Sequence, residues 1–137
     1  MTNLPASRGW YAPTTPLTVL ERLEGVALAA LTTVAFIGAG FAWWWLLVLF
    51  LVFDVSGLGF LAGPRPGAIT YNSVHNYVAP TLLLGAYAVL QSAGLSAQPL
   101  ALVAGCWFFH VAVDRALGFG PRPIGQVQER LAAGTRP

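Results

Sequence analysis

Four long apolar stretches, separated by short segments rich in glycine and proline, constrain this chain more than any other feature. Of its 137 residues, 56% are hydrophobic and only 9% are charged. Soluble domains carry about 25% charged residues, so this chain has too little charge to cover a surface that faces water. The sequence therefore predicts an integral membrane protein with one domain. A crossing takes about 20 residues, and the length allows four of them.

The predicted fold is all-α, a polytopic bundle of four transmembrane helices that cover residues 17–40, 41–62, 68–90 and 99–118. Glycine, proline and polar residues break the helices at the connections. Residues 1–16 and 119–137 are expected to form tails outside the membrane. The single cysteine, Cys106, excludes an internal disulfide.

The arginines orient the bundle. The two tails and the loop between the second and third helices carry Arg8, Arg65, Arg122, Arg130 and Arg136, whereas the opposite loops carry no charge. The positive-inside rule then predicts a multi-pass membrane protein with both termini in the cytoplasm. The few, scattered arginines exclude nucleic acid as a partner and leave membrane lipids and an apolar small molecule.

Two segments of the chain resemble each other. Asp54 is followed by Leu-Gly-Phe at 58–60 and Gly-Pro-Arg-Pro at 63–66, and Asp114 by Leu-Gly-Phe at 117–119 and Gly-Pro-Arg-Pro at 120–123. This similarity suggests two duplicated helical hairpins. The alternative is that glycine, proline and arginine are common at cytoplasmic helix ends.

The ionisable residues inside the predicted helices fall at one depth. Ionisable groups at the centre of a membrane helix cost roughly 2.5–3.5 kcal/mol, so they point to function. Counting along each helix places Glu24, Asp54, His75 and His110 about 10–12 Å below the cytoplasmic surface. We therefore expect one polar cluster in the cytoplasmic half of the bundle.

Helical spacing extends this cluster. Tyr71, Asn72, His75 and Asn76 share one face of the third helix, and His110 and Asp114 are four residues apart on the fourth. The predicted catalytic residues are Asp54, His75, His110 and Asp114. The predicted substrate-binding or orienting residues are Glu24, Tyr71, Asn72, Asn76, Trp107 and Arg115.

Each of these residues also has a structural alternative. The asparagines could join helices, the histidines and Trp107 could simply pack, and Arg115 could reach the interface or neutralise an aspartate.

The motifs around these residues resemble a known family. Residues 54–67, the run from Tyr71 to His75, and the run from His110 through Asp114 and Arg115 are similar to a family of small bacterial four-helix membrane proteins, the domain of unknown function 4260. The resemblance covers roughly residues 20 to 120. It implies the four-helix fold and a place in the bacterial inner membrane, and it supports the importance of the histidines, the aspartates and Arg115. This uncharacterised family implies no activity.

Several functions fit these residues. The first is a membrane-embedded acid–base enzyme that isomerises, cyclises or hydrolyses a lipid or isoprenoid. The second is a proton-coupled transporter or ion pathway built as an oligomer. The third is a metal-binding or structural subunit, with a metal ion at His75, His110 and Asp114; apart from this ion, no cofactor is expected. Gly59 and Gly63 form a small-xxx-small pair that suits a homo-oligomer.

Overall fold

The computed structural model describes residues 18–122 and 124, and all secondary structure in this part of the chain is helical. The element order is α1 (Val19–Gly38), α2 (Trp44–Asp54), the 3₁₀ helix η1 (Val55–Ala62), α3 (Pro64–Val74), α4 (Val78–Ser92) and α5 (Gln98–Leu117). The predicted all-α class is confirmed. The predicted tail at 1–16 and most of the one at 119–137 lie outside the described residues.

Local signals in the sequence explain where α1 and α5 begin and end. Thr18 and Glu21 form a capping box that satisfies free backbone N–H groups at the start of α1. Gly118 ends α5 with a φ of 95°, a left-handed conformation that glycine adopts without a steric cost.

Residues 63–67 were predicted to form a helix-breaking loop. Instead, Gly63 caps α3 and residues 64–67 form its first turn. Pro64 occupies the first turn, where a missing backbone N–H costs nothing because that group has no partner within the helix. The preceding residue, Gly63, has a φ of 123° and lets the chain reverse direction sharply between η1 and α3.

The predicted continuous helix over 68–90 is wrong, because the chain breaks at residues 75–77 between α3 and α4. Pro80 has no backbone N–H to donate to the carbonyl of Asn76, so an unbroken helix would lack a hydrogen bond here. The Asn76 amide nitrogen donates to the carbonyls of Asn72 and Ser73, and its oxygen accepts from Val78 N–H at 2.9 Å. The Asn76 side chain thus caps both helices at the break.

Two helices, Trp44–Ala62 and Gln98–Leu117, are long and apolar enough to cross a membrane. The first combines α2 and η1, since the chain tightens from α to 3₁₀ winding after Asp54 without a break. The other two long helices differ from this pair. Helix α1 carries three charged residues within its first one and a half turns, and α4 has only 15 residues.

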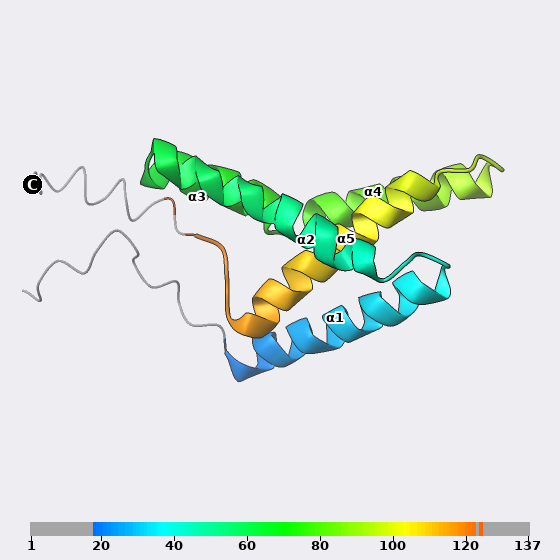
Figure 1. Ribbon diagram of the computed structural model, residues 1–137, viewed down its shortest axis with the longest axis horizontal. Coiled ribbons are helices and arrows are strands. Elements are labelled where there is room, and N and C mark those ends of the chain that lie inside the picture. The colour runs from blue at the N-terminus through cyan, green and yellow to red at the C-terminus, as the bar shows by residue number, and fades with distance from the viewer. Residues whose placement is uncertain (1–17, 123, 125–137) are drawn as a thin grey trace, which may run out of the picture.

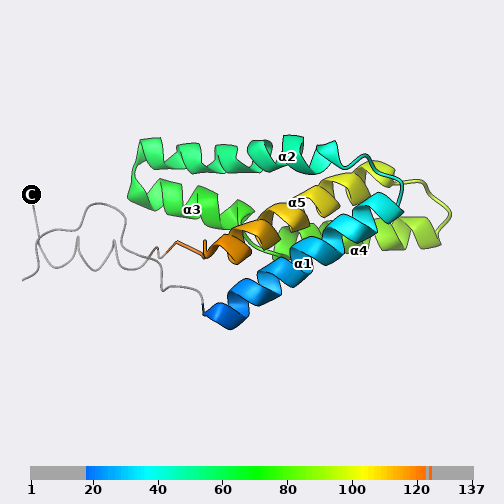
Figure 2. The ribbon, with the colours of Figure 1, turned by 60° about the horizontal axis from the view of Figure 1, so that its bottom comes forward.

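Helix α5 lies at the centre of the structure, with α1, α2 and α4 packed against it, while η1 packs against α3 (Figures 1 and 2). Helix α1 approaches α5 so closely at Gly25 that a Cβ there would overlap the α5 backbone. The last turns of α1, the start of α2 and the middle of α5 share an apolar core around Phe36, Leu46 and Cys106. Because α1 packs along α5, the helix pairing does not display the suggested repeat of two hairpins.

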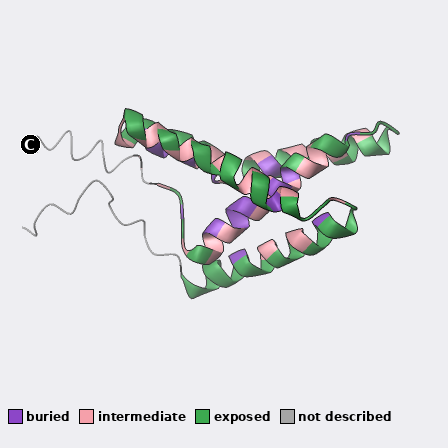
Figure 3. Ribbon diagram, viewed as in Figure 1, coloured by how far each residue is buried: buried purple, intermediate pink, exposed green. Residues whose placement is uncertain are grey.

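Burial follows this arrangement. Buried residues gather on α5 and on the segments that cross it, whereas the outer faces of α1 and α2 are largely exposed (Figure 3). The fully buried side chains of α5 include His110, which lies where α2 crosses this helix. The crossing therefore sets the position of the candidate site.

Candidate functional site

The structure brings together the four predicted catalytic residues from three separate segments. Asp54 ends α2, His75 lies at the break after α3, and His110 and Asp114 lie on α5. The two histidine Nε2 atoms are 3.0 Å apart. Asp114 Oδ2 is 3.3 Å from the Nε2 of His75 and 3.9 Å from that of His110. Asp54 Oδ1 is 3.8 and 3.9 Å from the same two atoms.

The break between α3 and α4 positions His75. Its backbone N–H still donates to Tyr71 O, and its ring stacks on the Tyr71 ring with centroids 3.7 Å apart. Its Nδ1 lies 3.0 Å from the same Tyr71 carbonyl oxygen. A carbonyl oxygen only accepts hydrogen bonds, so this contact requires a proton on Nδ1 and, in the neutral ring, leaves the Nε2 lone pair facing the cluster.

Aromatic rings hold His110. The ring of Phe50 meets the His110 ring edge to face at 4.4 Å, and that of Phe53 lies 5.5 Å away. The His110 side chain is fully buried, and no described residue offers its Nδ1 a hydrogen-bond partner. The ring can therefore act on the rest of the cluster only through Nε2.

The two aspartates differ in their surroundings. The Asp114 side chain is 11% exposed, and its Oδ2 accepts a hydrogen bond from the Tyr71 hydroxyl at 3.3 Å. The Asp54 side chain is 50% exposed. Asp54 therefore forms the open side of the cluster, and Asp114 forms its closed side.

The two predicted orienting asparagines have backbone partners. The Asn72 amide donates to Arg122 O and accepts from Arg122 N, both at 2.7 Å, which attaches residues 118–122 to α3. The Asn76 amide caps the break between α3 and α4. These contacts agree with the structural alternative, in which the asparagines join segments of the chain.

The other predicted orienting residues lie around the cluster or away from it. Tyr71 is part of it, through both its hydroxyl and its carbonyl. The Trp107 indole donates to Val74 O at 2.6 Å and stacks on Phe53, so it borders the cluster. Among the described residues, the ion pairs of the two aspartates involve only histidines, and Arg115 forms an ion pair with neither. Glu24 is exposed on α1 and makes no side-chain hydrogen bond to a described residue.

Two residues near the site were missed by the sequence analysis. Ser56 Oγ lies 3.4 Å from His75 Nδ1, and the Arg122 guanidinium lies over the Tyr71 ring, 5.1 Å from its centroid. Ser56 comes two residues after Asp54, a spacing that separates side chains on a regular helix. Arg122 was assigned to a tail because nothing near it in the sequence shows that this segment returns to α3.

Comparison with known proteins places these residues within one family. The family model of the domain of unknown function DUF4260 matches residues 18–126, which include every residue of the cluster. No curated protein and no solved structure gives a significant match. The chain, as its motifs suggested, belongs to the DUF4260 family.

Proposed function

We propose that this protein is a membrane-embedded enzyme that transfers protons to or from a lipid or isoprenoid substrate at the cluster of Asp54, His75, His110 and Asp114. The observation that carries the proposal is the convergence of these side chains from three segments at a buried helix crossing. Ionisable groups in such surroundings are costly and are retained mainly at functional sites.

The geometry suits proton transfer. General acid–base catalysis needs a donor and an acceptor within about 2.6–3.2 Å, and these distances are often longer before substrate binds. The Nε2 atoms of the two histidines are 3.0 Å apart, and Asp114 Oδ2 lies 3.3 Å from His75. Asp54, on the open side, is the residue best placed to meet a substrate group, and the buried residues can then pass or hold its proton.

The surroundings of the cluster suit an apolar substrate. The rings of Phe50 and Phe53 flank His110, the Trp107 ring stacks on Phe53, and the Tyr71 ring covers His75. Aromatic faces bind hydrocarbon chains and also stabilise a developing positive charge. Isomerisation, cyclisation and hydrolysis of a lipid or isoprenoid are the reactions that fit this combination.

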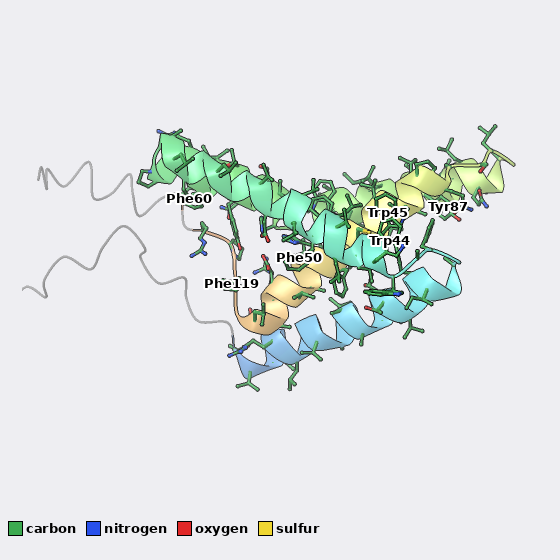
Figure 4. The ribbon with its side chains drawn as sticks, in the orientation of Figure 1. Trp44, Trp45, Phe50, Phe60, Tyr87 and Phe119 are labelled. Carbon is green, nitrogen blue, oxygen red and sulfur yellow. The ribbon has the colours of Figure 1, made fainter. Side chains whose placement is uncertain are left out.

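The outer surface favours a membrane setting with four crossings. Large apolar side chains on α1, α2, η1 and α4 are exposed, among them Val34 at 71%, Leu51 at 70%, Leu61 at 86% and Leu82 at 69%. We propose that α1 and the broken pair α3–α4 cross the membrane together with the two longer apolar helices, with both termini in the cytoplasm. Trp44, Trp45 and Tyr87 lie toward one end of the molecule and Phe60 and Phe119 toward the other, which is typical of aromatic residues at two interfaces (Figure 4).

Native mass spectrometry of the protein in a mild detergent, followed by extraction and identification of bound molecules, tests this proposal. We expect a stoichiometric lipid or isoprenoid, and its conversion on incubation with the protein. His110→Gln and Asp114→Asn should bind the molecule without converting it. Glu21→Gln is the matched control, because glutamine also completes a capping box. A protein that carries no such molecule but conducts protons in liposomes would support the transporter instead.

A further inference from the structure

We propose that Asp54, His75 and His110 together hold one divalent metal ion of the Zn²⁺ class, with two nitrogen ligands, one oxygen ligand and a fourth position left open. The sequence analysis considered His75, His110 and Asp114 as an alternative metal site, and the structure places Asp54 rather than Asp114 with the two histidines in one group of ligand atoms. The inference concerns the same cluster as the proposed enzyme, but it does not depend on any reaction there.

The first argument is the spacing of the ligand atoms. Zn²⁺ binds histidine nitrogen and carboxylate oxygen at about 2.0–2.2 Å, so a tetrahedral site places neighbouring ligand atoms about 3.3–3.5 Å apart. The distances that join the two Nε2 atoms to each other and to the carboxylate oxygens run from 3.0 to 3.9 Å. One ion between Asp54 Oδ1 and the two Nε2 atoms would reach all three after shifts of a few tenths of an ångström.

The second argument is the shell around the ligands. A histidine that binds a metal through one ring nitrogen typically donates its other N–H to a carbonyl or carboxylate, which fixes the tautomer. Nδ1 of His75 meets Tyr71 O at 3.0 Å, and the Tyr71 hydroxyl donates to Asp114 Oδ2. Tyr71 thus supports a nitrogen ligand through its carbonyl and holds the Asp114 carboxylate beside the site through its hydroxyl.

The third argument is charge. Two carboxylates face each other across two histidines, and among the described residues no arginine forms an ion pair with either aspartate. Removing an unpaired carboxylate from water is expensive. One divalent cation balances both negative charges and satisfies both Nε2 lone pairs, whereas in its absence the same atoms depend on shared protons.

The exposure of Asp54 indicates how an ion would enter. The two histidine ligands are at most 3% exposed, so the half-exposed Asp54 carboxylate is the accessible side of the site. Bound there, Zn²⁺ would act as a Lewis acid toward water or a substrate oxygen.

Metal binding by the purified, tag-free protein in detergent tests this inference. After treatment with a chelator, the wild-type protein should bind one Zn²⁺ per chain by isothermal titration calorimetry and by elemental analysis. Co²⁺ in the same site should give the intense visible absorption of tetrahedral coordination, and Zn²⁺ should abolish it by displacement. Adding Zn²⁺ should also raise the melting temperature.

Variants then locate the ion. His75→Ala and His110→Ala should abolish stoichiometric binding, and Asp54→Asn should weaken it more than 10-fold while retaining the fold, because its side chain is half exposed. Tyr71→Phe keeps the backbone carbonyl that supports His75 and removes only the hydroxyl that holds Asp114, so it should weaken binding less than Asp54→Asn does. Glu21→Gln removes an exposed carboxylate on α1 and should bind as the wild type does.

Two results would overturn the inference: a wild-type protein that gives no tetrahedral Co²⁺ spectrum, or an Asp54→Asn variant with unchanged affinity. A protein that binds Zn²⁺ stoichiometrically but carries and converts no lipid would refute the proposed enzyme and leave the metal site standing. The reverse result, conversion without any metal, would refute only the metal site.

Discussion

The segments that begin at Asp54 and Asp114 share an aspartate, a Leu-Gly-Phe and a Gly-Pro-Arg, yet the structure uses them differently. After Asp54 the chain continues as the 3₁₀ helix η1 and turns back into α3. After Asp114, α5 ends within one turn at Gly118, and the following residues cross to α3. Both segments still deliver their aspartate to one cluster. The same residues therefore serve different packing in each segment, and only the position of the aspartate is shared.

The largest expected effects come from replacing the two aspartates, which should lose the same activity but differ in stability. Asp114→Asn and Asp54→Asn should each lower proton-transfer turnover by about 10²–10⁴-fold if the cluster performs general acid–base catalysis. In addition, Asp114→Asn should lower the free energy of unfolding by about 1–3 kcal/mol, because it removes the buried negative charge that faces both the Tyr71 hydroxyl and His75 Nε2. Asp54→Asn should change that free energy much less. Chemical unfolding in detergent and product analysis measure both effects, and equal destabilisation by the two variants would contradict the assigned open and closed sides.

The next comparison is between two glycines of η1, Gly59 and Gly57. A Cβ at Gly59 would overlap the side chain of Thr70 on α3, so Gly59→Leu should lower the free energy of unfolding by about 1–3 kcal/mol. Gly57→Leu, in the same 3₁₀ helix, has nothing within 4 Å of its Cβ position and is the control. Because Gly59 contacts α3 of its own chain, we also expect Gly59→Leu to leave the oligomeric state unchanged in native mass spectra. A shift in that state would favour the small-xxx-small pair as a contact between chains.

Replacing Arg122 or Arg65 should give a smaller difference in the free energy of unfolding. The Arg122 guanidinium lies over the Tyr71 ring, so Arg122→Ala should lower the free energy of unfolding by about 0.5–2 kcal/mol. Arg65 is exposed in the first turn of α3, and Arg65→Ala should change it by less than about 0.5 kcal/mol. Thermal unfolding followed by tryptophan fluorescence compares the variants. Equal effects would mean that residues 118–122 do not lie on α3 as described.

The smallest effect belongs to the glycine that ends α5. Gly118 has a φ of 95°, a conformation that costs other residues about 1 kcal/mol, so Gly118→Ala should destabilise by about that amount. Gly38, in the last turn of α1, has a negative φ and open space around it, and Gly38→Ala should leave stability unchanged or slightly raise it. Calorimetry in detergent measures both, and a destabilising Gly38→Ala would contradict this account.

The sequence predicts the helices best where an apolar run is continuous. The expected helices at 17–40, 41–62 and 99–118 begin and end within three residues of α1, α2–η1 and α5. The prediction failed at 68–90, where continuous hydrophobicity concealed a break that Pro80 and Asn76 produce together. The proline signal was visible, but the cap by Asn76 depends on a side-chain rotamer that periodicity does not encode.

The sequence likewise predicts part of the candidate site and misses the rest. Counting positions along each predicted helix placed Asp54, His75 and His110 at one depth, and the structure brings them into contact. Glu24 has the same predicted depth but is exposed, because depth along a helix says nothing about rotation around its axis. Asn72 and Arg122, 50 residues apart, meet through a chain reversal that no local pattern announces.

The sequence by itself determined the helical class, the positions of the apolar helices and the identity of the ionisable residues, because the cost of burying charge and the periodicity of a helix are local properties. Only the tertiary structure decided which of those residues meet. The crossing of α2 over α5, the close approach of α1 at Gly25 and the break at His75 set the rotation of each helix. Contact between side chains depends on that rotation, which packing between distant segments fixes.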